Sequence, residues 1–243
     1  MVDSISVDKW LDFWKYYEGN PNQELAVREL FENIPTSLKL ERSRWITQYR
    51  EPEPEPEKPE VSNPLQVEYD CQLDHGDEGW RLCFTASCAM AAHYEDPSIS
   101  IAEYYARRPK YGDSTDPSAQ IRTLQSFGLD CKYVQIGSVA KLKEQIDLGY
   151  CCPVGFLHHG QSPSAPSGGG HWILALGYYE ENGGGLIAHD PYGELDNING
   201  GYPKTGGTYG KYIKYSWKYW TPRWSVSNDH DGWGMGIRKP GKS

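Results

Sequence analysis

The chain has 243 residues, of which 38% are hydrophobic, and a formal net charge of −9 at pH 7. This length allows one large domain or a small domain followed by a medium one. The acidic charge argues against nucleic-acid binding, which needs clustered Lys and Arg. No apolar run approaches the roughly 20 residues of a membrane helix. Because the N-terminus also lacks the basic and apolar regions of a signal peptide, we expect synthesis in a cytoplasm without membrane insertion.

The first fifty residues predict a small helical module. Apolar side chains at Val7, Trp10, Leu11 and Trp14 follow the spacing of one helical face, and two more apolar stripes precede residue 50. A module of residues 1–49 is marginal in size on its own. Its many aromatic residues fit a small core, and they fit equally a binding face for a wall polymer or a protein partner.

A linker separates this module from the rest of the chain. Residues 51–60 alternate Glu with Pro almost throughout, which excludes helix and sheet because proline fixes φ and lacks an N–H donor. Such a segment is a semi-rigid spacer on the order of 30 Å long. The sequence therefore predicts a linker over 50–64 and a larger domain over 65–243.

The larger domain predicts helices first and strands last. Helices are expected over 85–94, 100–107, 116–127 and 139–148, and strands over 131–136, 151–157, 171–179, 185–190, 211–217 and 233–237. Ser100 with Glu103 predicts a capping box, and Asp116-Pro117 predicts a helix start. This order indicates an α+β fold with an antiparallel sheet. The polar segments 160–170 and 196–210 are long enough to be functional loops.

One of the six cysteines is placed as a nucleophile. Cys83 stands at the start of a predicted helix, where the helix dipole and free N–H groups favour a thiolate. Cys88 lies inside the same helix, turned about 140° away from Cys83, so only one of the two faces a cleft. The spacing of the cysteines matches no zinc site, and the other five are expected to be small buried apolar residues.

A histidine and an aspartate follow the cysteine in the order that a cysteine hydrolase needs. His171 begins an apolar strand after a run of glycines, and Asp190 ends the next strand before Pro191. His171 is suited to act as a base, and Asp190 to accept its second ring N–H. Each also has an ordinary explanation, as a polar residue at a strand edge and as turn chemistry. Gln72 is a candidate oxyanion donor beside the backbone N–H of Cys83, although in isolation it is an unremarkable polar residue.

Taken together, these motifs resemble the bacteriocin-leader (double-glycine) peptidase-like branch of the papain-like cysteine peptidases. The resemblance covers residues 66–192 and rests on Gln72, Cys83 with Ser87-Ala89-Met90, Gly170-His171-Trp172 with Gly177-Tyr178, and Asp190-Pro191. It implies a papain-like fold with Cys83 as nucleophile, His171 as general base, Asp190 as orienting residue and Gln72 as oxyanion donor. In two respects the chain departs from the pattern: Phe84-Thr85 replaces the usual Gly-Pro, and the segment from Gln72 to Cys83 is longer.

The resemblance implies a hydrolase of peptide or amide bonds without a metal or cofactor. The N-terminal module and linker resemble modules of phage lysis proteins, which favours a peptidoglycan substrate and a role as a phage lysin or virion-associated wall hydrolase. Such a protein is made in the host cytoplasm and acts at the cell wall, with residues 1–49 available for other virion proteins. The alternatives are a protease that matures a protein substrate, and a non-enzymatic virion structural or adaptor protein that keeps the fold.

Overall fold

The computed structural model describes residues 63–241. The predicted helical module of residues 1–49 and nearly all of the linker over 50–64 lie outside these residues. The division of the chain into a module, a linker and a larger domain therefore stays a prediction. Within 63–241 the predicted α+β order, helices first and antiparallel strands last, is confirmed.

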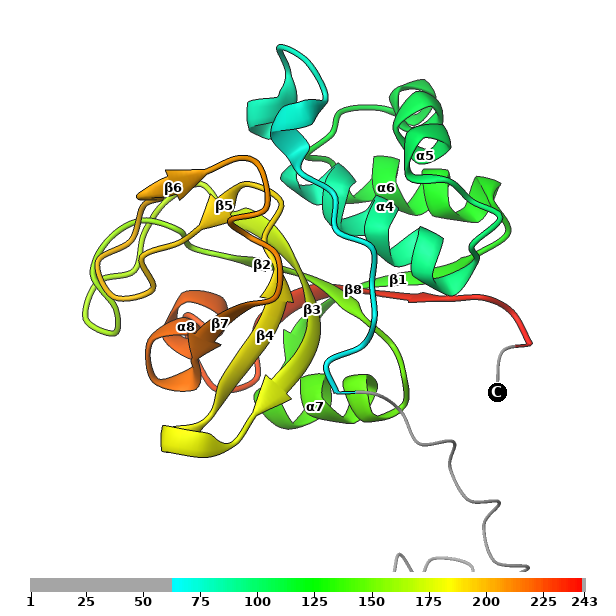
Figure 1. Ribbon diagram of the computed structural model, residues 1–243. Coiled ribbons are helices and arrows are strands. Elements are labelled where there is room, and N and C mark those ends of the chain that lie inside the picture. Colours follow the sequence, from blue (N-terminus) through cyan, green and yellow to red (C-terminus); the bar gives the residue numbers. More distant parts are fainter. Residues whose placement is uncertain (1–62, 242–243) are drawn as a thin grey trace, which may run out of the picture. The chain divides into compact units, whose positions relative to one another are not determined.

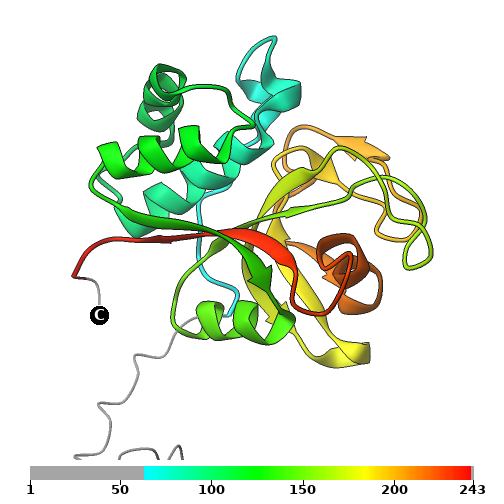
Figure 2. The same cartoon turned by 180° about the vertical axis from the view of Figure 1, so that it is seen from behind.

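Three helices come first and gather beside the sheet (Figures 1 and 2). They are α4 (Cys83–Glu95), α5 (Ile101–Arg107) and α6 (Pro117–Ser126), with short 3-10 turns at η1 (Gln72–Asp74), η2 (Gly79–Arg81) and η3 (Arg108–Tyr111). The predicted start signals are confirmed, because Ser100 and Asp116 cap α5 and α6 with their side chains. The predicted capping box forms only in part: the Glu103 carboxylate turns to Arg107, 2.6 Å away.

Six antiparallel strands form the main sheet in the order β1-β8-β2-β3-β4-β7. They are β1 (Asp130–Gly137), β2 (Cys152–Phe156), β3 (His171–Tyr179), β4 (Gly185–His189), β7 (Ile213–Ser216) and β8 (Gly232–Arg238); η4 (Glu181–Gly183) joins β3 to β4, and β5 (Gly193–Glu194) pairs with β6 (Lys204–Thr205). In the β3–β4 pair, Leu174 lies opposite His189. The start of β3 and the end of β4 therefore lie at the same end of the sheet.

Two further helices pack on the sheet, and one of them was not predicted. The predicted α7 (Val139–Asp147) is confirmed, with Gly149 just beyond it at φ +83°. The strand predicted over 211–217 is longer than the observed strand β7, which ends at Ser216. The helix α8 (Trp217–Trp224) begins at the next residue. Pro222 lies inside α8 and four aromatic residues share it, so neither composition nor helix propensity indicated a helix there.

The core forms where α4 lies against the sheet. All residues of α4 from Phe84 to Ala92 are buried, and the helix packs on β2 and β3 and on α5 and α6. A helix that is enclosed in this way carries apolar or small side chains on every face, which explains its alanine-rich sequence. The first residue of this enclosed helix is Cys83, so the core fixes the position of the thiol.

The segment leading to α4 is tied to the sheet and to the end of β4 by hydrogen bonds of its own backbone groups. Leu65 donates to the carbonyl of Leu176 at 2.8 Å, and the His189 ring nitrogen Nε2 lies 3.0 Å from the Val67 carbonyl. Gln72 donates its backbone N–H to the Pro191 carbonyl at 2.9 Å. These bonds hold the turn before α4 next to the end of β4, where Asp190 lies.

Candidate active site

Cys83 is the first residue of α4, is partly exposed and lines a cleft. No side chain caps the start of this helix, so no side chain competes there for its first N–H groups. Cys88, by contrast, is fully buried in the same helix, and burial raises its pKa well above the usual value. A thiol in that state is not a nucleophile. Of the two cysteines, only Cys83 is placed for chemistry.

His171 faces Asp190 from the neighbouring strand. Its Nε2 lies 2.8 Å from Asp190 Oδ1. The ring lines the same cleft as Cys83, and it is close enough for the charge of that thiol to raise the pKa of the imidazole. Because Asp190 accepts from Nε2, the other ring nitrogen, Nδ1, is the one that can exchange a proton with the thiol. Gly170, at φ +80°, turns the chain sharply before His171 enters β3. The structure thus brings Cys83, His171 and Asp190 together at one place, with His171 between the thiol and the carboxylate.

The electrostatics of His171 follow from this arrangement. Burial lowers the pKa of the ring, but the charges of Asp190 and Cys83 and their hydrogen bonds to it outweigh burial and raise the pKa to about 10. These neighbours therefore favour the protonated form of His171. A protonated imidazole beside a thiol favours the thiolate, which is the reactive form.

Asp190 is held by four donors. It is fully buried just after β4, and besides His171 its carboxylate accepts the Tyr192 backbone N–H at 3.0 Å, the Tyr202 hydroxyl at 2.8 Å and the Tyr215 hydroxyl at 3.1 Å. A buried carboxylate without such partners would be costly. The two tyrosine hydroxyls donate to Oδ2, whereas the Tyr192 N–H and His171 share Oδ1. No local sequence signal pointed to these tyrosines, because they reach Asp190 from separate segments.

A cleft of about 510 Å³ opens beside the thiol and the imidazole. Its walls come from η2, the start of α4, the segment that follows β2, the start of β3 and parts of the polar loops predicted over 160–170 and 196–210. Its lining includes Trp80, Cys83, His158, His159, His171 and Tyr202. His158 and His159 follow the end of β2 and contribute to the wall of this cleft.

The cleft wall is braced from behind by a buried arginine. Arg223 of α8 is fully buried and donates to five backbone carbonyls. These belong to Leu157, His159, Gly160, Asn197 and Ile198. The guanidinium thereby joins the segments 157–160 and 197–198, which approach the cleft from two parts of the chain. Sequence reasoning missed Arg223 because an isolated Arg in an aromatic stretch carries no pattern.

Gln72 is close to this region but does not line the cleft. Its side chain is buried, with Nε2 donating to the Gly79 carbonyl at 2.8 Å, while Oε1 has no hydrogen-bond partner among the described residues. The amide is thus engaged with the turn that precedes α4. The oxyanion role predicted for Gln72 stays a prediction, and the backbone N–H of Cys83 is the donor that lies at the thiol.

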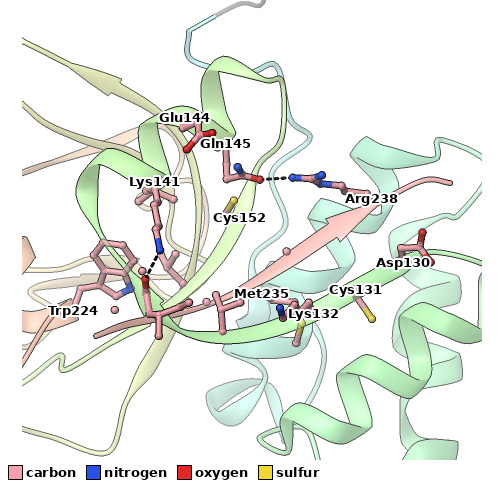
Figure 3. A pocket seen from close by; sticks show the side chains of 18 residues that line it. Asp130, Cys131, Lys132, Lys141, Glu144, Gln145, Cys152, Trp224, Met235 and Arg238 are labelled. Atoms are coloured by element: carbon pink, nitrogen blue, oxygen red, sulfur yellow. Dashed lines mark hydrogen bonds between the residues drawn. The ribbon is translucent and has the colours of Figure 1, made fainter. Parts of the chain in front are cut away.

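A second hollow lies elsewhere on the sheet and contains none of the predicted site residues. This groove of about 550 Å³ runs between β1, β8 and α7 (Figure 3) and is mainly apolar. Lys141, Gln145 and Arg238 stand at its edge, where Arg238 bonds Gln145 at 2.6 Å. Although it is slightly larger, it offers no nucleophile–base pair, so the cleft beside Cys83 is the candidate active site.

Two further findings concern residues 63–241. No helix in this range is long and apolar enough to cross a membrane. The same range holds no cluster of three or more His, Cys, Asp or Glu side chains placed to bind a metal ion.

Comparison with known proteins finds similarity among solved structures alone. No protein-family model matches the chain, and no curated protein matches it. Among solved structures, the chain is similar to the peptidase domain of Streptococcus ComA, a bifunctional ABC transporter involved in a quorum-sensing pathway. The identity is 18%, the match covers 65% of this chain and 92% of that domain, and the TM-score is 0.39. At this TM-score the similarity adds nothing to the geometry described above.

Proposed function

We propose that this protein is a papain-like cysteine hydrolase that cleaves peptide or amide bonds. The observation that carries the proposal is the placement of Cys83 and His171 in the wall of one cleft, with His171 Nε2 2.8 Å from Asp190 Oδ1. A partly exposed thiol at a helix start, a protonated imidazole and an orienting carboxylate are the three groups that nucleophilic thiol catalysis needs.

The geometry supports a two-stage reaction. The Cys83 thiolate attacks the carbonyl carbon of the scissile bond, and the backbone N–H of Cys83 stabilises the resulting oxyanion. His171 gives its proton to the leaving nitrogen as the carbon–nitrogen bond breaks, which leaves a thioester and a neutral imidazole. Water then attacks the thioester, with His171 taking its proton, and the acid product leaves. Asp190 holds the ring through Nε2 in both stages.

We further propose peptidoglycan as the substrate, with the protein acting as a phage lysin or virion-associated wall hydrolase. The support is the acidic proline-rich segment 51–60 and the aromatic residues of 1–49, which suit a binding module tethered to an enzyme on an insoluble polymer. On this proposal the protein is made in the host cytoplasm and acts at the cell wall. A maturation protease would use the same three residues on a protein substrate.

Digestion of purified cell wall tests the proposal. The full chain should release fragments whose masses identify the cleaved bond, Cys83→Ala should abolish their release, and Cys88→Ala should largely retain it. Protein substrates cut in place of the wall would favour the maturation protease. Absence of any hydrolysis, together with an unreactive Cys83 thiol, would favour a non-enzymatic structural protein.

A further inference from the structure

His158 is a second histidine in the cleft and has no part in the reaction described above. It lines the same cleft as Cys83 and His171, and its ring centroid lies 5.9 Å from that of His171 and 6.2 Å from that of Tyr202. Its side chain is only partly buried. A polar group of this kind at the wall of a cleft is available to a bound molecule.

The backbone around His158 is fixed on both sides. Arg223 Nη1 donates to the carbonyl of Leu157 at 3.1 Å and to that of His159 at 2.9 Å. The His158 carbonyl itself accepts the Gly201 backbone N–H at 2.8 Å. These bonds preorganise the position of His158, so a ligand that meets it has little ordering cost to overcome.

The hydrogen-bonding state of the ring follows from its surroundings. Its Nδ1 atom is buried and has no hydrogen-bond partner among residues 63–241. An N–H donor buried without an acceptor is costly, so the neutral ring carries its proton on Nε2. Burial, together with the positive charge of His171, lowers the pKa of His158 to about 4, which keeps the ring neutral at neutral pH.

We propose that His158 Nε2–H donates a hydrogen bond to a backbone carbonyl oxygen of the bound substrate, next to the bond that Cys83 attacks. This rests on the function proposed above and adds a substrate-binding residue to it. Because Nδ1 is enclosed, Nε2 is the ring nitrogen that a molecule bound in the cleft can contact. The hydrogen-bonded backbone on both sides holds the residue in place. A neutral donor also suits this place, because a second positive charge would oppose the protonation of His171. The ligand class is therefore a peptide or amide chain with a carbonyl acceptor beside the scissile bond.

Two thiol reagents separate substrate binding from thiol reactivity. In acetyl-Ala-Ala-Ala chloromethyl ketone, the Cys83 thiolate forms a carbon–sulfur bond and displaces chloride, and the peptide offers backbone carbonyls to the cleft. With methyl methanethiolsulfonate, the thiolate forms a disulfide and releases methanesulfinate, with no peptide carbonyl involved. The rate constant for modification of Cys83 is measured for both reagents on the full chain, by mass spectrometry of the labelled peptide.

The variants are His158→Phe and His158→Leu, which lack the donor, and His158→Gln, whose amide nitrogen reaches a position similar to that of Nε2. Thermal unfolding selects whichever of the first two melts within about 5 °C of the wild type. We expect that variant to react roughly tenfold more slowly with the chloromethyl ketone and unchanged with the thiosulfonate, and His158→Gln to recover most of the loss. His230→Phe, an exposed histidine outside the cleft, is the control.

The outcomes separate this inference from the proposed function. In one outcome, both reagents modify wild-type Cys83, and the donor-free variant loses the same factor in both rate constants. This would mean that His158 affects the reactivity of the thiol, and it would overturn this inference but not the proposed function. An unchanged chloromethyl ketone rate would overturn it as well. A wild-type Cys83 that neither reagent modifies would overturn the proposed function and this inference with it.

Discussion

Phe84 and Trp172 stack face to face, with ring centroids 3.6 Å apart and planes 5° from parallel. Phe84 follows Cys83 along α4, and Trp172 follows His171 along β3. The stacked pair therefore joins the residue after the proposed nucleophile to the residue after the proposed base. It is a direct packing contact between the helix that carries the thiol and the strand that carries the imidazole.

Removing this contact should cost both stability and reactivity. We expect Phe84→Ala to lower the free energy of unfolding by about 3–5 kcal/mol, because Phe84 is fully buried and leaves a cavity. Urea unfolding measures this loss, and the alkylation rate of Cys83 in the folded state reports the site. Leu124→Ala, in the buried face of α6, is the control for stability loss alone. If both variants slow alkylation equally, the stacked pair has no special link to the site.

Asp190→Asn should be milder than His171→Ala. The amide oxygen of Asn can still accept the ring N–H, and the third residue orients the base without taking a proton. We expect the loss in kcat/KM to be roughly 10- to 100-fold smaller for Asp190→Asn than for His171→Ala. Kinetics on a small peptide substrate measure it, with circular dichroism to confirm folding. Equal losses would assign Asp190 another task.

The buried histidine of β4 should make the fold sensitive to acid. His189 Nε2 faces the Val67 carbonyl and its Nδ1 accepts the Tyr212 backbone N–H, so the folded state needs a neutral ring. Mainly because of burial, its pKa is lowered from 6.5 to about 4. The unfolded chain therefore binds an extra proton between these values, and stability falls as pH decreases from about 6.5 to 4.

The contribution of one such group is up to about 1.4 kcal/mol per pH unit. Urea unfolding at pH 5 and pH 7 measures the difference for the wild type and for His189→Gln, whose amide keeps both a donor and an acceptor. We expect a smaller difference between the two pH values in the variant. The pKa of His158 is also lowered to about 4, mainly by burial. Because His158 is present in both proteins, its contribution cancels in the comparison. An identical pH dependence in wild type and variant would contradict this account of His189.

Removal of residues 1–60 should separate binding from catalysis. If the linker tethers a binding module to the enzyme, the module raises the local substrate concentration without touching the cleft. We expect residues 61–243 to hydrolyse a small soluble peptide nearly as fast as the full chain, and to bind and clear intact walls much less. Wall pull-down and turbidity loss measure the second effect. Equal clearing by both proteins would instead favour a docking role for residues 1–49.

Much of the fold could be predicted because its signals are local. The Ser100 and Asp116 caps and the bounds of β3 each depend on a few neighbouring residues, and they are confirmed. The order of helices and strands then indicated an α+β domain. The helix α8 was missed because Pro222 and the aromatic residues around it lower the local helix propensity. Tertiary packing overrides this local preference, and the helix forms.

The amino-acid sequence by itself determined which residue types stand at a helix start and at two strand ends, and hence named Cys83, His171 and Asp190 as candidates. Only the tertiary structure decided what surrounds them. The tyrosines on Asp190 and the carbonyls on Arg223 come from segments that meet through sheet register and loop packing. Packing likewise turned the Gln72 amide toward Gly79. Local patterns extend over a few residues, whereas these contacts depend on how the whole chain closes around one core.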